Sequence, residues 1–135
     1  MAPLDEKGAA RYAGRMASDI TPPDFVYRLA TGDEWVEAQA SNVVPTRDID
    51  KRDGYIHLST REQALETANI HFASEQDLLA LVIPYERVSA LTKFELAPKR
   101  GKYFPHLYGA LTVEHISRAI KLVRGGDGFS FGEEL

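Results

Sequence analysis

Hydrophobic and polar residues alternate over residues 54–60, which read Gly-Tyr-Ile-His-Leu-Ser-Thr. Successive side chains of a β-strand point to opposite faces, so Ile56 and Leu58 are expected to enter the core. His57 and Ser59 then share the opposite face. The pattern predicts a short strand that presents a histidine beside a hydroxyl group.

A second segment, residues 104–109, repeats this arrangement with the residues Phe-Pro-His-Leu-Tyr-Gly. His106 and Tyr108 fall on one predicted face, and Pro105 and Leu107 fall on the other. A single site that uses both segments requires the fold to bring their histidines together, because proton transfer needs hydrogen-bond reach or one intervening water.

Helix starts are marked by capping boxes, in which a Ser or Thr hydroxyl and a Glu or Gln three residues later satisfy backbone N–H groups of the first turn. Such boxes occur at Thr31 with Glu34, at Ser59 with Glu62 and at Thr60 with Gln63. The first predicts a helix that follows a β-prone segment at residues 25–30. The other two predict a helix directly after His57 and leave open which hydroxyl caps it.

The second half of the chain carries mostly strand patterns. Continuous or alternating apolar residues predict strands at residues 78–83, 91–96 and 120–123. Residues 112–118 are expected to form a short helix, and the polar residues 45–53 are expected to form a loop. This order of elements predicts an α+β domain, because helices do not alternate with strands throughout the chain.

The chain is expected to hold a single domain at residues 24–124. Residues 1–23 end in Thr-Pro-Pro and are interpreted as a flexible N-terminal extension, with a short helix possible at residues 9–17. The glycine-rich sequence Gly-Gly-Asp-Gly begins at residue 125 and indicates a flexible C-terminal tail at residues 125–135.

Composition narrows the function classes. With no cysteine among 135 residues, a disulfide framework, a thiolate zinc site and a catalytic cysteine are excluded. The net charge of −4 argues against binding of duplex nucleic acid, which depends on phosphate neutralisation by many Lys and Arg side chains. No long apolar segment or secretory signal is evident, so we expect a cytoplasmic protein without membrane association. A small anionic ligand or a nucleotide remains compatible with the charge.

Other familiar kinds of catalytic site find little support. His71 and His115 have no partner at metal-ligand spacing, so no metal site is expected. The chain also lacks the G-x-S-x-G pattern of a serine nucleophile, which disfavours a hydrolase.

Several motifs in combination point to a known family. They are Phe25-Val-Tyr-Arg-Leu, Trp35, Gly54-Tyr-Ile-His-Leu-Ser-Thr, Gln63 and Phe104-Pro-His-Leu-Tyr-Gly. Together they resemble domain-of-unknown-function family 952, which occurs in bacteria and plants. The resemblance implies an ADP-ribosyltransferase-like fold, a split antiparallel β-sandwich with a few short helices. In active members of that fold group a cleft holds NAD.

Within the fold group the chain most resembles the RNA 2′-phosphotransferases. By that analogy Arg28, His57 and His106 occupy the three catalytic motif positions. Two departures stand out. Family members often carry His at the position of Arg28, and no Glu stands beside the third motif, where toxin-type members use one. Transfer to a protein side chain is therefore disfavoured.

Each candidate also has a structural interpretation. In the functional interpretation His57 and His106 act on a ribose, and in the structural interpretation they are polar histidines at the surface. Arg28 presents a fork to a phosphate or is an exposed strand arginine. Ser59 and Thr60 are favoured as helix caps, although a helix N-terminus also attracts anions. The residues that the resemblance assigns to a nucleotide are Arg28, His57, Ser59, Thr60, Gln63 and Tyr108.

Three functions remain open from the sequence. The first is an NAD-dependent phospho- or ADP-ribosyltransferase, with NAD as the cofactor. The second is a non-catalytic domain that binds a nucleotide or a small anion in the same cleft. The third is a structural or regulatory domain whose histidine face is covered by another chain.

Overall fold

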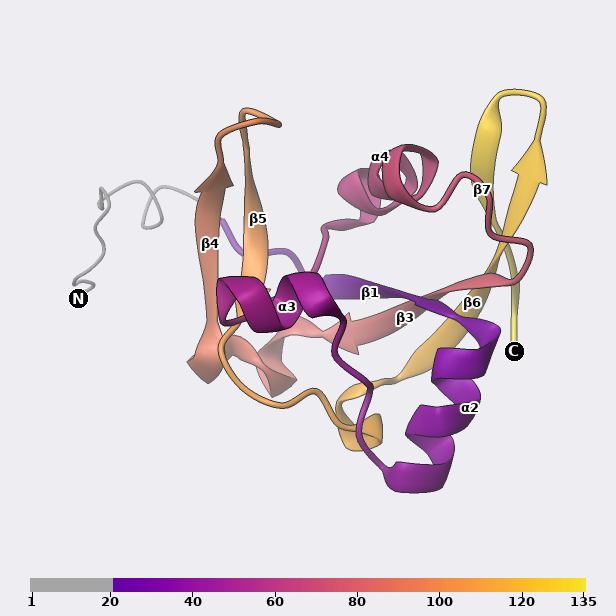
Figure 1. Ribbon diagram of the computed structural model, residues 1–135. Helices are drawn as coiled ribbons and strands as arrows, with labels where there is room; N and C mark the ends of the chain where they lie inside the picture. Colours follow the sequence, from indigo (N-terminus) through magenta and orange to yellow (C-terminus); the bar gives the residue numbers. More distant parts are fainter. Residues whose placement is uncertain (1–20) are drawn as a thin grey trace.

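A computed structural model describes residues 21–135, which form two antiparallel sheets and a few short helices (Figure 1). The strands are β1 (Phe25–Thr31), β2 (Ile56–His57), β3 (Leu78–Pro84), β4 (Thr92–Ala97), β5 (Lys102–Leu107), β6 (Arg118–Gly125) and β7 (Gly128–Glu134). The helices are α2 (Gly32–Ser41), α3 (Asp48–Asp53) and α4 (Arg61–His71), with 3₁₀ turns η1 (Tyr85–Arg87), η2 (Ser89–Leu91) and η3 (Val113–His115). The extension expected at residues 1–23, with its short helix, falls almost entirely outside the described residues.

The larger sheet has the strand order β1-β3-β6-β7, and the smaller one has the order β2-β5-β4. Each strand pair in the described part of the chain is antiparallel. The predicted α+β class, with antiparallel sheets and few short helices, is confirmed. Figure 1 shows the β4–β5 pair on one side of the molecule and the β6–β7 hairpin on the other. None of the described helices has the length and hydropathy needed to cross a bilayer.

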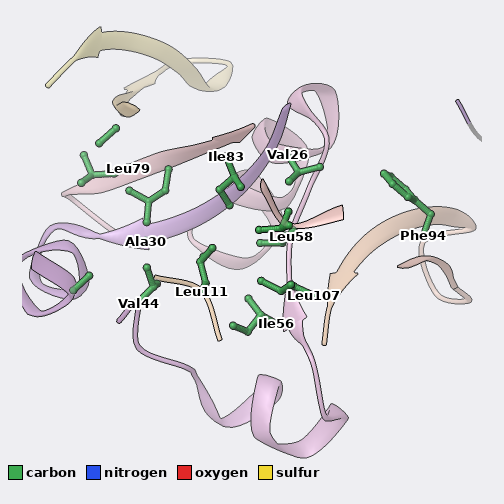
Figure 2. Packing of buried hydrophobic residues seen from close by; sticks show 14 residues of the cluster. Val26, Ala30, Val44, Ile56, Leu58, Leu79, Ile83, Phe94, Leu107 and Leu111 are labelled. Carbon is green, nitrogen blue, oxygen red and sulfur yellow. The ribbon is translucent and has the colours of Figure 1, made fainter. Parts of the chain in front are cut away.

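The β1–β3 pair is covered on both faces, which explains the continuous apolar run of β3. Successive side chains of a strand point to opposite faces, so neighbouring residues of β1 and β3 enter two different clusters of buried side chains. Leu79 and Ile83 belong to the cluster that also contains Ile56 and Leu107 of the smaller sheet (Figure 2), and Leu81 is a further member. The other cluster packs against α4 and contains Tyr27, Leu29, Leu78, Ala80, Val82, Ala64 and Ala68.

Capping boxes begin α2 and α4 as predicted. Thr31 and Glu34 close the box of α2. At α4 the structure uses Thr60, whose hydroxyl accepts from the backbone N–H of Gln63 at 3.3 Å. Ser59 instead forms a backbone bridge to Tyr27, with both N···O distances at 2.8 Å, and this bridge ties the motif to β1.

Three local predictions are corrected by the structure. The loop expected at residues 45–53 contains α3, and the helix expected at residues 112–118 is reduced to the 3₁₀ turn η3. The flexible tail expected at residues 125–135 is instead strand β7, which pairs with β6. Phe129 is buried and Phe131 packs partly against the same cluster, so the apolar alternation of this segment outweighed its glycines.

Candidate functional site

The two histidine segments meet in the smaller sheet, where β2 pairs with β5. Strands β2 and β5 pair so that His57 lies directly opposite His106, and the centroids of their rings are 5.7 Å apart. Ile56, Leu58 and Leu107 alternate with the two histidines along these segments and are buried beneath this face. The requirement for a single site, that the fold brings the two histidines together, is met.

Two tyrosines complete a group of four aromatic rings. The Tyr55 ring stacks on His106, with 3.9 Å between centroids and 18° between planes. It also lies 4.7 Å from the His57 ring and 5.3 Å from the Tyr108 ring. We call Tyr55, His57, His106 and Tyr108 the four-ring cluster. Tyr55 was missed in the sequence, although its odd number places it on the same strand face as His57.

A carboxylate from β4 fixes one half of the cluster. Glu95 Oε1 lies 2.8 Å from Nδ1 of His106 and accepts a hydrogen bond from the Tyr108 hydroxyl at 2.6 Å. Burial raises the pKa of Glu95, but the bonds from His106 and Tyr108 outweigh burial and hold this pKa below its ordinary value. Burial and the bond to Glu95 also raise the pKa of Tyr108, which keeps its hydroxyl a donor. No Glu stands beside the third motif in the sequence, and the neighbouring strand β4 brings Glu95 to His106.

Carboxylates of α3 hold both nitrogens of the other histidine. His57 Nδ1 lies 2.8 Å from Asp50 Oδ1, and His57 Nε2 lies 2.9 Å from Asp53 Oδ2. Asp50 is buried, whereas the Asp53 side chain is 24% exposed. Helix α3 ends at Gly54, whose φ of 84° is the left-handed conformation that glycine adopts most readily. This turn leads the chain directly into the cluster.

Arg28 lies beneath the cluster and does not reach the surface. Its side chain is only 2% exposed, and its two terminal nitrogens bind the Asp50 carboxylate at 3.2 and 2.8 Å. Nη1 also donates to the His57 carbonyl, Nη2 donates to the Pro45 carbonyl, and Nε has no hydrogen-bond partner among the described residues. The alternative of an exposed strand arginine is wrong. A phosphate could reach this fork only after the buried pair with Asp50 had opened.

The Arg28–Asp50 pair orients His57 from below. Burial lowers the pKa of Arg28. Burial also raises the pKa of Asp50, but hydrogen bonds from His57 and Arg28 more than offset it, so the pKa of Asp50 stays well below its ordinary value. Asp50 therefore remains an ionised acceptor at neutral pH. Such a carboxylate fixes the orientation and tautomer of the histidine that it holds.

The remaining predicted residues lie at the start of α4 and serve its structure. Gln63 Oε1 accepts from the Thr60 N–H at 3.1 Å, and Gln63 Nε2 donates to the Tyr103 carbonyl at 2.8 Å. Ser59 is buried at the bridge to β1. The predicted cap is confirmed for Thr60 and is wrong for Ser59. The role of these residues in binding a nucleotide stays a prediction.

The basic turn that precedes β5 is tied to α4. Arg100 Nη2 and Lys102 Nζ approach Glu66 Oε1 at 2.9 and 3.1 Å. These side chains thus belong to a solvated turn and form ion pairs with α4. Among the described residues, no group of three metal-ligating side chains is arranged to hold a metal ion.

Comparison with known proteins places the chain among relatives without an assigned activity. A family model described as protein of unknown function, DUF952, matches residues 29–119, a range that contains the four-ring cluster and Glu95. No curated protein matches the chain.

The fold is similar to that of protein CC0527 from Caulobacter crescentus. Its crystal structure superposes with a TM-score of 0.70 and 34% sequence identity, over 78% of this chain and 91% of that chain. A crystal structure of a double mutant of CC0527 gives the same values, and the solution NMR structure covers 79% of this chain. The family match spans well over half of the sequence. The chain therefore belongs to the DUF952 family of proteins of unknown function.

Proposed function

We propose that the four-ring cluster is the site of an NAD-dependent transferase, of the kind that the ADP-ribosyltransferases and the RNA 2′-phosphotransferases represent. The observation that carries the proposal is the register of β2 and β5, which places the His57 and His106 rings 5.7 Å apart on one face. In this assignment the two histidines position the nicotinamide ribose and exchange protons with it.

The surroundings of the rings support proton transfer. Each histidine has its Nδ1 held by a carboxylate, Asp50 for His57 and Glu95 for His106, at 2.8 Å in both cases. A histidine held in this way has its ring fixed in direction, and a ligand reaches Nε2 of His57 once Asp53 has left it. A positioned acid or base contributes about 10²- to 10⁴-fold to a rate. Tyr55 and Tyr108 add aromatic faces on which a planar nicotinamide or adenine ring can stack.

Arg28 takes a positioning role in this proposal. Its guanidinium is buried against Asp50, and Asp50 in turn holds His57. It therefore acts on the site through Asp50 and makes no contact with the ligand. This differs from the phosphate fork that the resemblance implies for the same residue.

The proposal is tested by titration calorimetry with NAD, followed by chromatography for free nicotinamide after incubation. We expect a saturable heat and nicotinamide release in the wild-type protein, and the loss of both in His57→Ala and His106→Ala. His71→Ala is the matched control, because His71 is exposed on α4 and lies outside the cluster. No heat and no nicotinamide at millimolar NAD would refute the proposal.

A second candidate is a non-catalytic domain that binds a nucleotide or a small anion. It is favoured by one observation, namely that both ring nitrogens of His57 already contact carboxylates, at 2.8 and 2.9 Å. A histidine in this state has no nitrogen available for proton exchange with a ligand. Heat of NAD binding without nicotinamide release would identify this second function.

A further inference from the structure

The carboxylate of Asp53 is bound by cationic or ring donors through both of its oxygens. Arg52 Nε lies 2.9 Å from Asp53 Oδ1, and Arg52 Nη2 lies 3.3 Å from Asp53 Oδ2. His57 Nε2 approaches Oδ2 from the other side at 2.9 Å. A guanidinium fork joined by one further N–H donor is a common means of holding the oxygens of a phosphate or a carboxylate.

His57 Nε2 donates to Asp53 when that nitrogen carries a proton. Ionised carboxylates only accept hydrogen bonds, and His57 faces one at each ring nitrogen, Asp50 at Nδ1 and Asp53 at Nε2. Both contacts are hydrogen bonds at once only when each nitrogen carries a proton. In that form the ring presents an N–H at Nε2 to whatever oxygen lies there.

Asp53 is the weakly held member of this arrangement. The Arg52 side chain is 71% exposed, and exposed ion pairs contribute little to stability. Asp50, one turn earlier on α3, is buried and bound by Arg28 and by the backbone N–H of Arg47 at 2.7 Å. Helix α3 is therefore anchored through Asp50, and Asp53 can leave His57 without loss of that anchor.

The turn beyond Asp53 is open. Gly54 follows directly in the left-handed conformation, and apart from its two chain neighbours no described atom lies within 4 Å of the position of a Cβ there. The Asp53 side chain itself is 24% exposed. Two neighbouring carboxylates already have partners, since Asp50 faces Arg28, and Glu95 faces His106. An incoming anion in place of Asp53 would thus meet two donors, and the released Asp53 carboxylate would be the unpaired negative charge beside it.

We propose that Arg52 and His57 Nε2 form an oxyanion subsite, and that the Asp53 carboxylate fills it as an internal ligand until a phosphate group displaces it. The subsite extends the proposed function, on which it rests for the identity of the full ligand, because it assigns the phosphate of a nucleotide to Arg52. Arg28, which the resemblance put in this role, is buried. Asp53 then competes with the ligand and lowers its apparent affinity.

The test is a titration with inorganic phosphate, followed by NMR at the ring nitrogens of His57 and by calorimetry. Asp53→Asn removes the competing charge and should tighten phosphate binding about fivefold or more, the order expected for one charge near contact distance in water. Asp48→Asn is the control, because Asp48 is exposed on the first turn of the same helix, and it should leave the affinity unchanged. Arg52→Gln, at an exposed position, should weaken phosphate binding about fivefold or more.

Equal or weaker phosphate affinity in Asp53→Asn than in the wild type would overturn the subsite, as would unchanged affinity in Arg52→Gln. These outcomes are separate from the fate of the transferase. If phosphate binding follows the predictions while NAD neither binds nor releases nicotinamide, the subsite stands and the proposed function fails. If NAD binds at the cluster and Asp53→Asn has no effect on phosphate, the subsite alone fails.

Discussion

Replacing Asp50 with alanine removes the carboxylate that faces Arg28 inside the protein. The side chains of Arg28 and Asp50 are each 2% exposed, so water has little access to the guanidinium that is left behind. Removal of one partner from a buried ion pair typically costs about 3–5 kcal/mol, because an uncompensated charge stays in the interior. Asp50 also accepts from the backbone of Arg47 and contacts His57, so the variant loses the cap of α3 and the support of the ring.

The cost is a large part of the stability of a domain of this size, which is about 5–15 kcal/mol. An unfolding entropy of about 2.1 cal/mol/K per residue over the described residues 21–135 gives about 0.24 kcal/mol/K. The expected loss therefore lowers Tm by roughly 12–20 °C, a shift that thermal unfolding followed by circular dichroism resolves easily.

A double variant separates the buried charge from the rest of the change. Arg28→Met combined with Asp50→Leu replaces the pair with apolar side chains, an exchange that is often neutral or stabilising. We expect it to recover at least half of the Tm lost in Asp50→Ala. Asp48→Ala, at an exposed position of the same helix, should change stability by less than about 0.5 kcal/mol. A Tm shift under about 4 °C in Asp50→Ala, or no recovery in the double variant, would refute the reasoning.

Three further predictions concern the cap of α4, the stability of the protein at acid pH and the four-ring cluster. Thr60→Ala should lower the free energy of unfolding in urea by about 1 kcal/mol, whereas Glu62→Ala should change it by less than about 0.5 kcal/mol; equal losses would contradict the choice of cap. The pKa of Asp50 is raised by burial but lowered more by its bonds to His57 and Arg28, so its stabilising effect is present above its ordinary value of 3.8 and is lost as pH falls below about 4. Urea midpoints between pH 2 and 6 should thus fall more steeply in the wild type than in Asp50→Asn, and parallel curves would contradict this. Tyr108→Phe removes a 2.6 Å bond to Glu95 at a half-exposed position, so it should weaken NAD binding severalfold and change Tm by only a few degrees; unchanged binding in calorimetry would contradict its place in the site.

Local signals in the sequence predicted those elements that local physics determines. The run from Leu78 to Ile83 became β3, and capping boxes marked the starts of α2 and α4. The choice between Ser59 and Thr60 as a cap depended on a distant strand, because β1 binds the backbone of Ser59. A capping box describes only its own turn, so this choice lay beyond the sequence.

The alternation of side chains along each strand predicted which of them share a face. The register between paired strands determines which of them come into contact. His57 and His106 were both placed on polar faces, and only the pairing of β2 with β5 sets them opposite each other. Glu95 reaches His106 because β4 pairs with β5 in one particular register. Register over long sequence separation depends on the whole packed sheet, which explains why Glu95 was missed.

The acidic residues of α3 were missed for a different reason. Residues 45–53 are polar and charged, and a six-residue helix has too few internal hydrogen bonds to be stable alone. The helix is held by the bond from Arg28 to Asp50, which spans 22 positions in the sequence. The same bond turned Arg28 from an expected surface fork into a buried support for His57.

The most direct test of the account follows the ring nitrogens of all four histidines by NMR while NAD is added. If the four-ring cluster is the ligand site, the signals of His57 and His106 should shift together and saturate at one NAD concentration. His71 on α4 and His115 in η3 lie outside the cluster, and their signals should stay in place. Unchanged His57 and His106 signals at millimolar NAD, or equal shifts at His71 and His115, would contradict the account.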